Sequence, residues 1–96
     1  MNNISIADLD QWKAEGRPFV LIDVREPFEH EQFNIGGANI PLASLAAGTG
    51  NIPTDQVIVL YCAKGIRSLI GMQKLAAKGY TQLYHLSGGV NLLYLS

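Results

Sequence analysis

Disulfide bonds are the first feature that the sequence lacks, because its 96 residues include one cysteine, Cys62. A small secreted scaffold held together by disulfides is therefore excluded, and we expect a reducing compartment, the cytoplasm. The sequence also lacks an apolar run approaching the roughly 20 residues that span a membrane. Its first residues have neither the basic start nor the apolar stretch of a secretory signal, so we expect none.

Charge gives little support for a polyanionic partner, because the formal net charge is −1. We therefore expect no nucleic acid and no membrane among the partners. Acidic residues are absent from Cys62 onward, where four residues are basic: Lys64, Arg67, Lys74 and Lys78. Either the cysteine lies in a local positive field, which favours its reactive thiolate, or folding mixes the two halves of the chain and the distribution has no such meaning.

Two near-continuous apolar runs, residues 19–24 and 56–62, are rich in Val, Ile and Leu. Such runs are typical of strands covered on both faces, as in a parallel sheet. Shorter strands are predicted at 38–42 and 82–86. Helical patterns alternate with the strands: one between an N-cap at Ser5 and a stop at Gly16, one starting at Pro27, a brief one after Pro41, one from Ser68 to Lys78, and a short tail helix after residues 87–89. This alternation predicts an α/β fold with a mainly parallel sheet.

Cys62 follows the most apolar strand, at the edge where parallel sheets bind ligands. The six-residue loop from Cys62 to Arg67 can direct backbone N–H groups at one anion, and the next helix adds its positive dipole end. Gly65 permits a backbone conformation that other residues avoid, and Ser68 can cap the helix or donate to the anion. These features favour a nucleophilic thiolate. The alternative is that a lone cysteine after an apolar strand is a small buried hydrophobic residue.

Two separate segments, in the right order, resemble the rhodanese-type sulfurtransferase family. One is "LIDVREPFEHEQFNIGGANIPL", and the other is "YCAKGIRS" followed by "KLAAKGYTQLYHLSGGV". The resemblance runs from about Phe19 to Val90 and implies one three-layer domain over residues 1–96, with helices flanking the central sheet. The "NIGG" stretch also resembles rhodanese domains attached to activating enzymes of molybdopterin and thiamine biosynthesis. That resemblance implies a sulfur-relay module or a fragment of a larger protein.

The resemblance also implies a chemistry. Cys62 would attack the outer sulfur of a donor such as thiosulfate and become a persulfide. It would then pass that sulfur to cyanide, a thiol or a sulfur-carrier protein, with no cofactor and no metal. The cations would attract the anionic donor, and the loop amides would cradle the persulfide. The residues implied for this loop are Ala63, Lys64, Gly65, Ile66, Arg67 and Ser68.

Asp23 and Arg25 are supporting candidates at the end of the first long strand. Asp23 is expected at the same sheet edge as Cys62, either as a charge partner that orients Arg67 or the loop, or as part of a structural pair. Arg25 is expected to form a structural pair with Glu29, because the two have the i,i+4 spacing of helical ion pairs.

The remaining notable residues are expected to have structural roles. His30 and His85 are interpreted as surface or packing residues, because neither has the company of ligands that a zinc site needs. Gly88 and Gly89 are expected to form a turn. Tyr94 is expected to fill the space of a tryptophan that usually follows the double glycine in the family. Gly71 lies within a predicted helix, where glycine costs roughly 1 kcal/mol relative to alanine.

Three other functions are open from the sequence. Cysteine phosphatases use a similar loop, but they typically place five residues between cysteine and arginine, and this chain places four. A shorter loop favours a sulfur anion over a tetrahedral phosphate. A binding module without turnover is weakened by the presence of Cys62. A redox sensor is weakened because no second cysteine is present to resolve an oxidised one.

Overall fold

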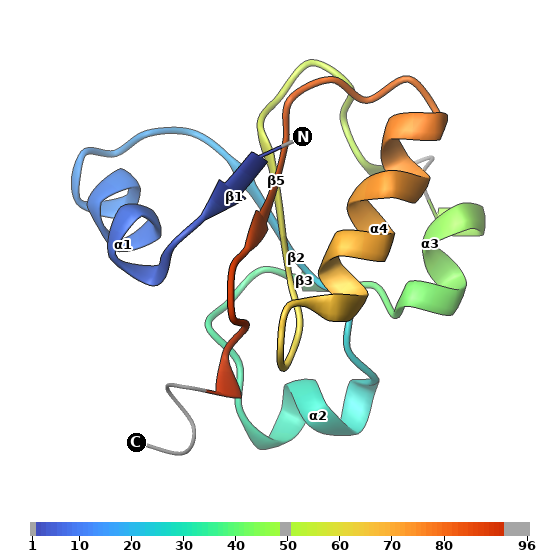
Figure 1. The fold of residues 1–96 in the computed structure, drawn as a ribbon, viewed down its shortest axis with the longest axis horizontal. Helices are drawn as coiled ribbons and strands as arrows, with labels where there is room; N and C mark the ends of the chain where they lie inside the picture. Colours follow the sequence, from blue (N-terminus) through green and yellow to red (C-terminus); the bar gives the residue numbers. More distant parts are fainter. Residues whose placement is uncertain (1, 49–50, 92–96) are drawn as a thin grey trace.

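The computed structural model describes residues 2–48 and 51–91, and within them five strands form one sheet (Figure 1). The strands are β1 (Asn2–Ile4), β2 (Val20–Asp23), β3 (Ala38–Asn39), β4 (Ile58–Tyr61) and β5 (Leu83–Leu86). Their order is β1-β5-β4-β2-β3, and each of these pairings is parallel. The predicted α/β fold with a mainly parallel sheet is confirmed. The strand β1 was not predicted, because "NNI" is too short and polar to give a strand pattern.

Helices cover both faces of the sheet, and one more helix lies at the ends of its strands (Figure 1). Helix α1 (Ile6–Ala14) lies on one face, and α3 (Leu42–Gly48) and α4 (Ile66–Ala77) pack side by side on the other. The short helix α2 (Pro27–Gln32) lies at the carboxyl ends of the strands, below the start of α4 in this view. This is the expected three-layer arrangement, with α2 added at the edge where parallel sheets bind ligands.

The core consists of one apolar cluster on each face of the sheet, with alternate residues of β4 in each. All four β4 residues are fully buried, as the continuous apolar run predicts. Burying a side chain of this size stabilises the fold by roughly 1.5–3 kcal/mol, so β4 is a rigid base for the cysteine that follows it. The α4 side of this strand comprises Ile58 and Leu60 with Met72 and Leu75, and the α1 side comprises Val59 and Tyr61 with Leu9.

Two helix starts deserve comparison with the sequence. Ser5 caps α1 as predicted, and its Oγ accepts a hydrogen bond from the Asp8 N–H at 3.0 Å. The helix α4 begins at Ile66 instead of the predicted Ser68, so Arg67 lies in its first turn.

Gly71 has a packing reason within α4: a Cβ there would lie 3.2 Å from Leu45 Cδ2 and 3.3 Å from a Leu60 methyl group. Glycine thus lets α4 approach α3 and the sheet closely.

Within residues 2–48 and 51–91, no helix is long and apolar enough to cross a membrane. The predicted tail helix and the space-filling position expected for Tyr94 lie outside the described residues.

Candidate active site

The candidate nucleophile, Cys62, directly follows β4 and is 1% exposed. Two main-chain N–H groups donate to its Sγ, from Gly65 at 3.1 Å and from Ser68 at 3.3 Å. Of the six residues from Ala63 to Ser68 that were predicted to surround the sulfur, Gly65 and Ser68 thus direct their N–H groups at Sγ. N–H groups directed at a sulfur favour its anionic form, because a thiolate accepts hydrogen bonds more strongly than a thiol.

The loop reaches this geometry through Gly65, the residue that precedes α4. Its φ of +96° is in the left-handed region that favours glycine. A Cβ on this residue would lie 3.2 Å from the Gly88 nitrogen, so space as well as backbone conformation selects glycine. The turn places the N-terminus of α4 next to Cys62, where the positive end of the helix dipole also favours a negative charge.

The double glycine after β5 packs against the backbone of the cysteine loop. A Cβ on Gly89 would lie 2.2 Å from the Ala63 carbonyl oxygen, and the φ of Gly89 is +71°. The next two residues bind the loop, because Val90 N–H donates to the Cys62 carbonyl and Asn91 N–H donates to the Ala63 carbonyl, both at 2.9 Å. The sequence predicted a turn here, and the turn has a second role as a close support for the loop.

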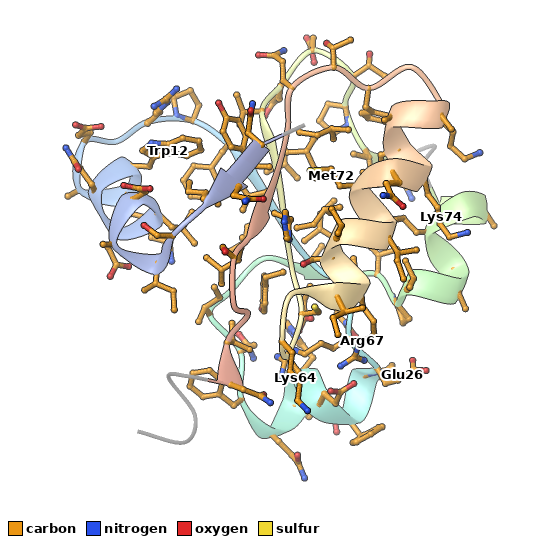
Figure 2. The ribbon with its side chains drawn as sticks, viewed as in Figure 1. Trp12, Glu26, Lys64, Arg67, Met72 and Lys74 are labelled. Carbon is orange, nitrogen blue, oxygen red and sulfur yellow. The ribbon has the colours of Figure 1, made fainter. Side chains whose placement is uncertain are left out.

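A pocket reaches the cysteine from outside. Figure 2 shows Lys64 and Arg67 at the same end of the sheet, next to α2. Lys64 is exposed, and Ile66 presents 67% of its surface to solvent beside the two cations. The pocket is therefore positively charged and has an apolar rim. Its lining residues are Cys62, Ala63, Lys64, Ile66 and Arg67.

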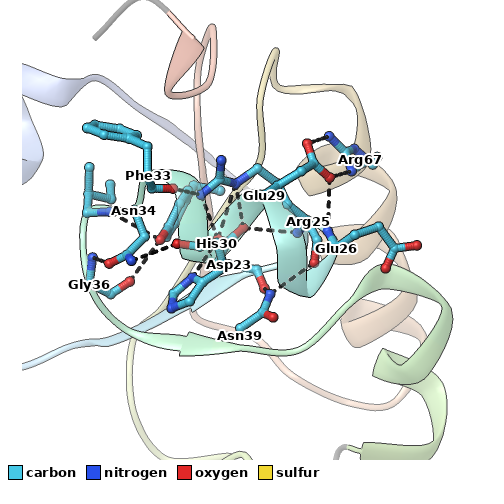
Figure 3. A network of polar contacts seen from close by, with 12 residues as sticks. Asp23, Arg25, Glu26, Glu29, His30, Phe33, Asn34, Gly36, Asn39 and Arg67 are labelled. Carbon is cyan, nitrogen blue, oxygen red and sulfur yellow. Dashed lines mark hydrogen bonds and ion pairs between the residues drawn. The ribbon is translucent and has the colours of Figure 1, made fainter. Parts of the chain in front are cut away.

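Arg67 is held by a carboxylate that the sequence assigned elsewhere. Its two terminal nitrogens donate to the two oxygens of Glu29 at 2.7 and 2.9 Å (Figure 3). The Arg67 hydrogen bond lowers the pKa of Glu29 from 4.5 to about 2. Glu29 also accepts from the Glu26 N–H at 3.0 Å, at the start of α2. The ion pair thus connects α2 to α4 at Arg67, one of the residues that line the pocket.

Asp23 and Arg25 form a buried pair near the same edge, with exposures of 0% and 5%. Arg25 Nε donates to Asp23 Oδ1 at 3.0 Å and Nη2 donates to Oδ2 at 2.8 Å. The structural interpretation of Asp23 therefore fits, whereas Arg67 takes its carboxylate from Glu29. The predicted pair of Arg25 and Glu29 is wrong. Helix α2 begins at Pro27, so Arg25 lies before the helix and the i,i+4 spacing does not apply to it.

The Asp23–Arg25 pair anchors the chain around α2 (Figure 3). His30 Nδ1 lies 2.8 Å from Asp23 Oδ2, and Arg25 donates to the Phe33 carbonyl. Asn39 donates its amide to the carbonyl of Arg25 at 2.9 Å. His30 is half-buried within this network, which places both ends of α2 against the strand ends and so positions Glu29 for Arg67.

A sequence model described as the Rhodanese-like domain matches residues 5–94. The chain belongs to the rhodanese family. It is 36% identical over 92 residues to the probable adenylyltransferase/sulfurtransferase MoeZ of Mycobacterium tuberculosis, covering 93% of this chain and 24% of MoeZ. It is 32% identical over 91 residues to a sulfurtransferase of Allochromatium vinosum, covering 94% of this chain and 85% of that protein. The human single-domain sulfurtransferase TSTD1 has a similar structure, with a TM-score of 0.83 and 26% identity over 98% of this chain and 96% of that one.

The rhodanese chain therefore spans about a quarter of the length of MoeZ and most of the length of the other two proteins. Its structure brings the predicted loop residues around Cys62 and adds three residues that sequence reasoning gave other roles: Glu29, Gly89, and His85, whose Nδ1 lies 3.0 Å from Ser68 Oγ. Glu29 and Gly89 had detectable signals, an acidic residue near a predicted helix start and a double glycine after a strand. For His85, the sequence carries no signal that distinguishes it from a packing residue.

Proposed function

We propose that this rhodanese domain is a sulfurtransferase that carries sulfane sulfur as a persulfide on Cys62. The observation that supports the proposal most strongly is the environment of the Cys62 sulfur. It accepts two main-chain N–H groups at the start of α4 and adjoins a pocket with two cations. The names of the similar proteins support the same class of reaction, because MoeZ, the Allochromatium protein and TSTD1 are each named as sulfurtransferases.

The first half-reaction loads the cysteine. The Cys62 thiolate attacks the outer sulfur of a donor such as thiosulfate, a new S–S bond forms, and the bond between the two donor sulfurs breaks. Sulfite leaves with the electron pair. The terminal sulfur of the persulfide carries the negative charge, which we expect the positive end of the α4 dipole to stabilise. The N–H groups of Gly65 and Ser68 are directed at Sγ, the inner sulfur of the persulfide.

The second half-reaction unloads it. A nucleophile such as cyanide or a thiolate attacks the terminal sulfur, and Cys62 leaves as a thiolate that the same N–H groups stabilise. No second cysteine is present to compete for the sulfur within the chain. The sulfur therefore passes to another molecule, and the site returns to its starting state.

We assign the attraction of the anionic donor to Lys64 and Arg67, and we expect Lys64 to contribute more. Arg67 already has a carboxylate partner in Glu29, so part of its charge is neutralised. The exposed Lys64 has greater freedom to meet an incoming anion. An anionic donor such as thiosulfate fits this pocket because two cations lie beside the sulfur that attacks it.

A second candidate is a sulfur-relay module whose acceptor is a carrier protein. Two observations favour a protein acceptor. The chain is 36% identical to part of MoeZ, whose name joins adenylyltransferase and sulfurtransferase. Two large apolar side chains are exposed on the elements near this end of the sheet: Ile66, which lines the pocket and is 67% exposed, and Phe28 on α2, which is 63% exposed. Both candidates share the persulfide on Cys62 and differ in what removes its sulfur.

The test is a thiosulfate:cyanide sulfurtransfer assay on the wild type and on Cys62→Ser. We expect transfer by the wild type and none by the variant, because a hydroxyl does not form the persulfide. An aryl phosphate serves as a parallel substrate for the phosphatase alternative. Equal sulfurtransfer rates in both proteins, or hydrolysis of the aryl phosphate alone, would refute the proposal.

A further inference from the structure

A buried histidine is connected to the cysteine through one serine. Ser68 Oγ lies 3.5 Å from Cys62 Sγ and 3.0 Å from His85 Nδ1. The three residues come from different places in the fold: Cys62 follows β4, Ser68 lies in the first turns of α4, and His85 lies in β5. Their exposures are 1%, 0% and 7%, so water does not readily replace any link in this chain.

Among the residues that the structure describes, the neighbours of His85 supply no charged group that pairs with its ring. Its neighbours in the sheet are Asn3 on β1 and Leu60 on β4. The charged residues of α4 are Arg67, which is paired with Glu29, and the exposed Lys74. The titratable residue of β4 is Tyr61, whose hydroxyl donates to the Gly36 carbonyl on the other side of the sheet.

Burial lowers the pKa of His85, so the imidazole is neutral at neutral pH and can accept a proton. Ser68 Oγ is also 3.2 Å from the Gly65 carbonyl. Its single hydroxyl proton can therefore be directed to that carbonyl or to His85. A hydroxyl with a choice of acceptors beside a thiol and a neutral imidazole has the parts that a proton transfer requires.

We propose that Ser68 and His85 form a proton relay that activates Cys62. The Cys62 thiol gives its proton to Ser68 Oγ while the Ser68 hydroxyl gives its own proton to His85 Nδ1. The products are a thiolate and an imidazolium, and the serine is unchanged. The two loop N–H groups stabilise the thiolate, whose charge offsets the cost of the buried imidazolium. His85 is thus a positioning residue that acts through Ser68, and its role in turnover rests on the function proposed above.

The test measures how much of Cys62 is thiolate as a function of pH, by ultraviolet absorbance of the thiolate in the full chain without donor. The informative variants are His85→Gln, which keeps a hydrogen-bonding side chain but accepts no proton, and Ser68→Ala, which breaks the link. We expect each to reduce the thiolate fraction at neutral pH about tenfold relative to the wild type. The double variant should lose no more than either single one, because both changes interrupt the same path.

The matched control is Tyr84→Phe, which alters the neighbour of His85 in β5 on the other face of the sheet, where Tyr84 packs against Trp12, outside the relay. It should titrate as the wild type does, and circular dichroism of every variant verifies folding. If His85→Gln does not fold, Ser68→Ala alone decides. Wild-type titration curves in the folded relay variants would overturn the relay.

Loading of sulfur from thiosulfate is measured separately on the same proteins. Intact loading with unchanged titration curves refutes the relay and leaves the proposed function standing. Shifted titration curves in the relay variants, together with a wild type that loads no sulfur, support the relay and refute the proposed function.

Discussion

The ion pair between Glu29 and Arg67 allows a prediction in which stability and donor affinity change in opposite directions. The perturbation is Glu29→Gln, which removes the negative charge and keeps an amide oxygen that can accept from Arg67. The pKa of Glu29 falls from 4.5 to about 2, mainly through the Arg67 hydrogen bond. One pKa unit corresponds to about 1.4 kcal/mol, so the whole shift corresponds to about 3 kcal/mol. The side chain of Arg67 is 34% exposed and that of Glu29 is 20% exposed, so solvent screens the pair. The expected loss of stability in Glu29→Gln is therefore about 1 kcal/mol.

The sign of the pH dependence follows from the lowered pKa. The stabilisation by Glu29 is fully present above its unfolded-state pKa near 4.5, and it is lost as the pH falls toward about 2. Urea unfolding of wild type and variant should therefore differ by about 1 kcal/mol at neutral pH. The difference should shrink as the solution is acidified through this range. A difference that stays constant down to the lowest pH at which the protein folds would refute the ion-pair explanation.

The same substitution should improve donor binding. Removing a negative charge beside the pocket leaves Arg67 more attractive to a dianion such as thiosulfate. We expect the KM for thiosulfate to fall about fivefold, which corresponds to about 1 kcal/mol, with kcat little changed. The assay is the steady-state thiosulfate:cyanide reaction at low salt. An increase in KM would contradict the view that Glu29 competes with the donor for Arg67.

Two further substitutions test the pocket and its support. Lys64→Met should raise the KM for thiosulfate several-fold at low salt, and this increase should become smaller as salt is added. The melting temperature should not change, because the Lys64 side chain is exposed. An increase in KM that does not depend on salt would argue against a charge role. Gly89→Ala should destabilise the chain by about 3 kcal/mol and reduce sulfurtransfer, because its Cβ would lie 2.2 Å from the Ala63 carbonyl oxygen. The control is Gly16→Ala, because Gly16 has a similar φ of +69° but no atom lies within 4 Å of the added Cβ. This variant should lose about 1 kcal/mol of stability and keep its activity. Equal losses of stability in the two variants would show that backbone conformation, and not the contact with the loop, is responsible.

The parts of the fold that the sequence predicted have strong local signals. The apolar run over 56–62 has the length and composition of a fully buried strand, and β4 lies within it. The Ser5 cap was predictable because capping depends on residues three apart in the sequence. Cys62 was placed at the carboxyl edge of the sheet by the same local reasoning. In contrast, β1 has no pattern of its own and is a strand because β5 offers it an edge.

The parts of the site that escaped prediction depend on contacts between distant segments. Glu29 and Arg67 are 38 residues apart, and the local i,i+4 pattern pointed to Arg25 as the partner instead. His85 is 17 residues from Ser68, and its meaning depends on β5 lying beside β4. A single sequence gives residue types and spacing along the chain, and these pairs are defined by the spatial order of the strands.

The most direct test of the account is the intact mass of the protein after treatment with thiosulfate. The account predicts that the wild type gains the mass of one sulfur atom, that cyanide removes it, and that Cys62→Ser gains nothing under the same conditions. A wild type whose mass is unchanged by thiosulfate and by other persulfide donors, or a Cys62→Ser variant that gains the same sulfur, would contradict it.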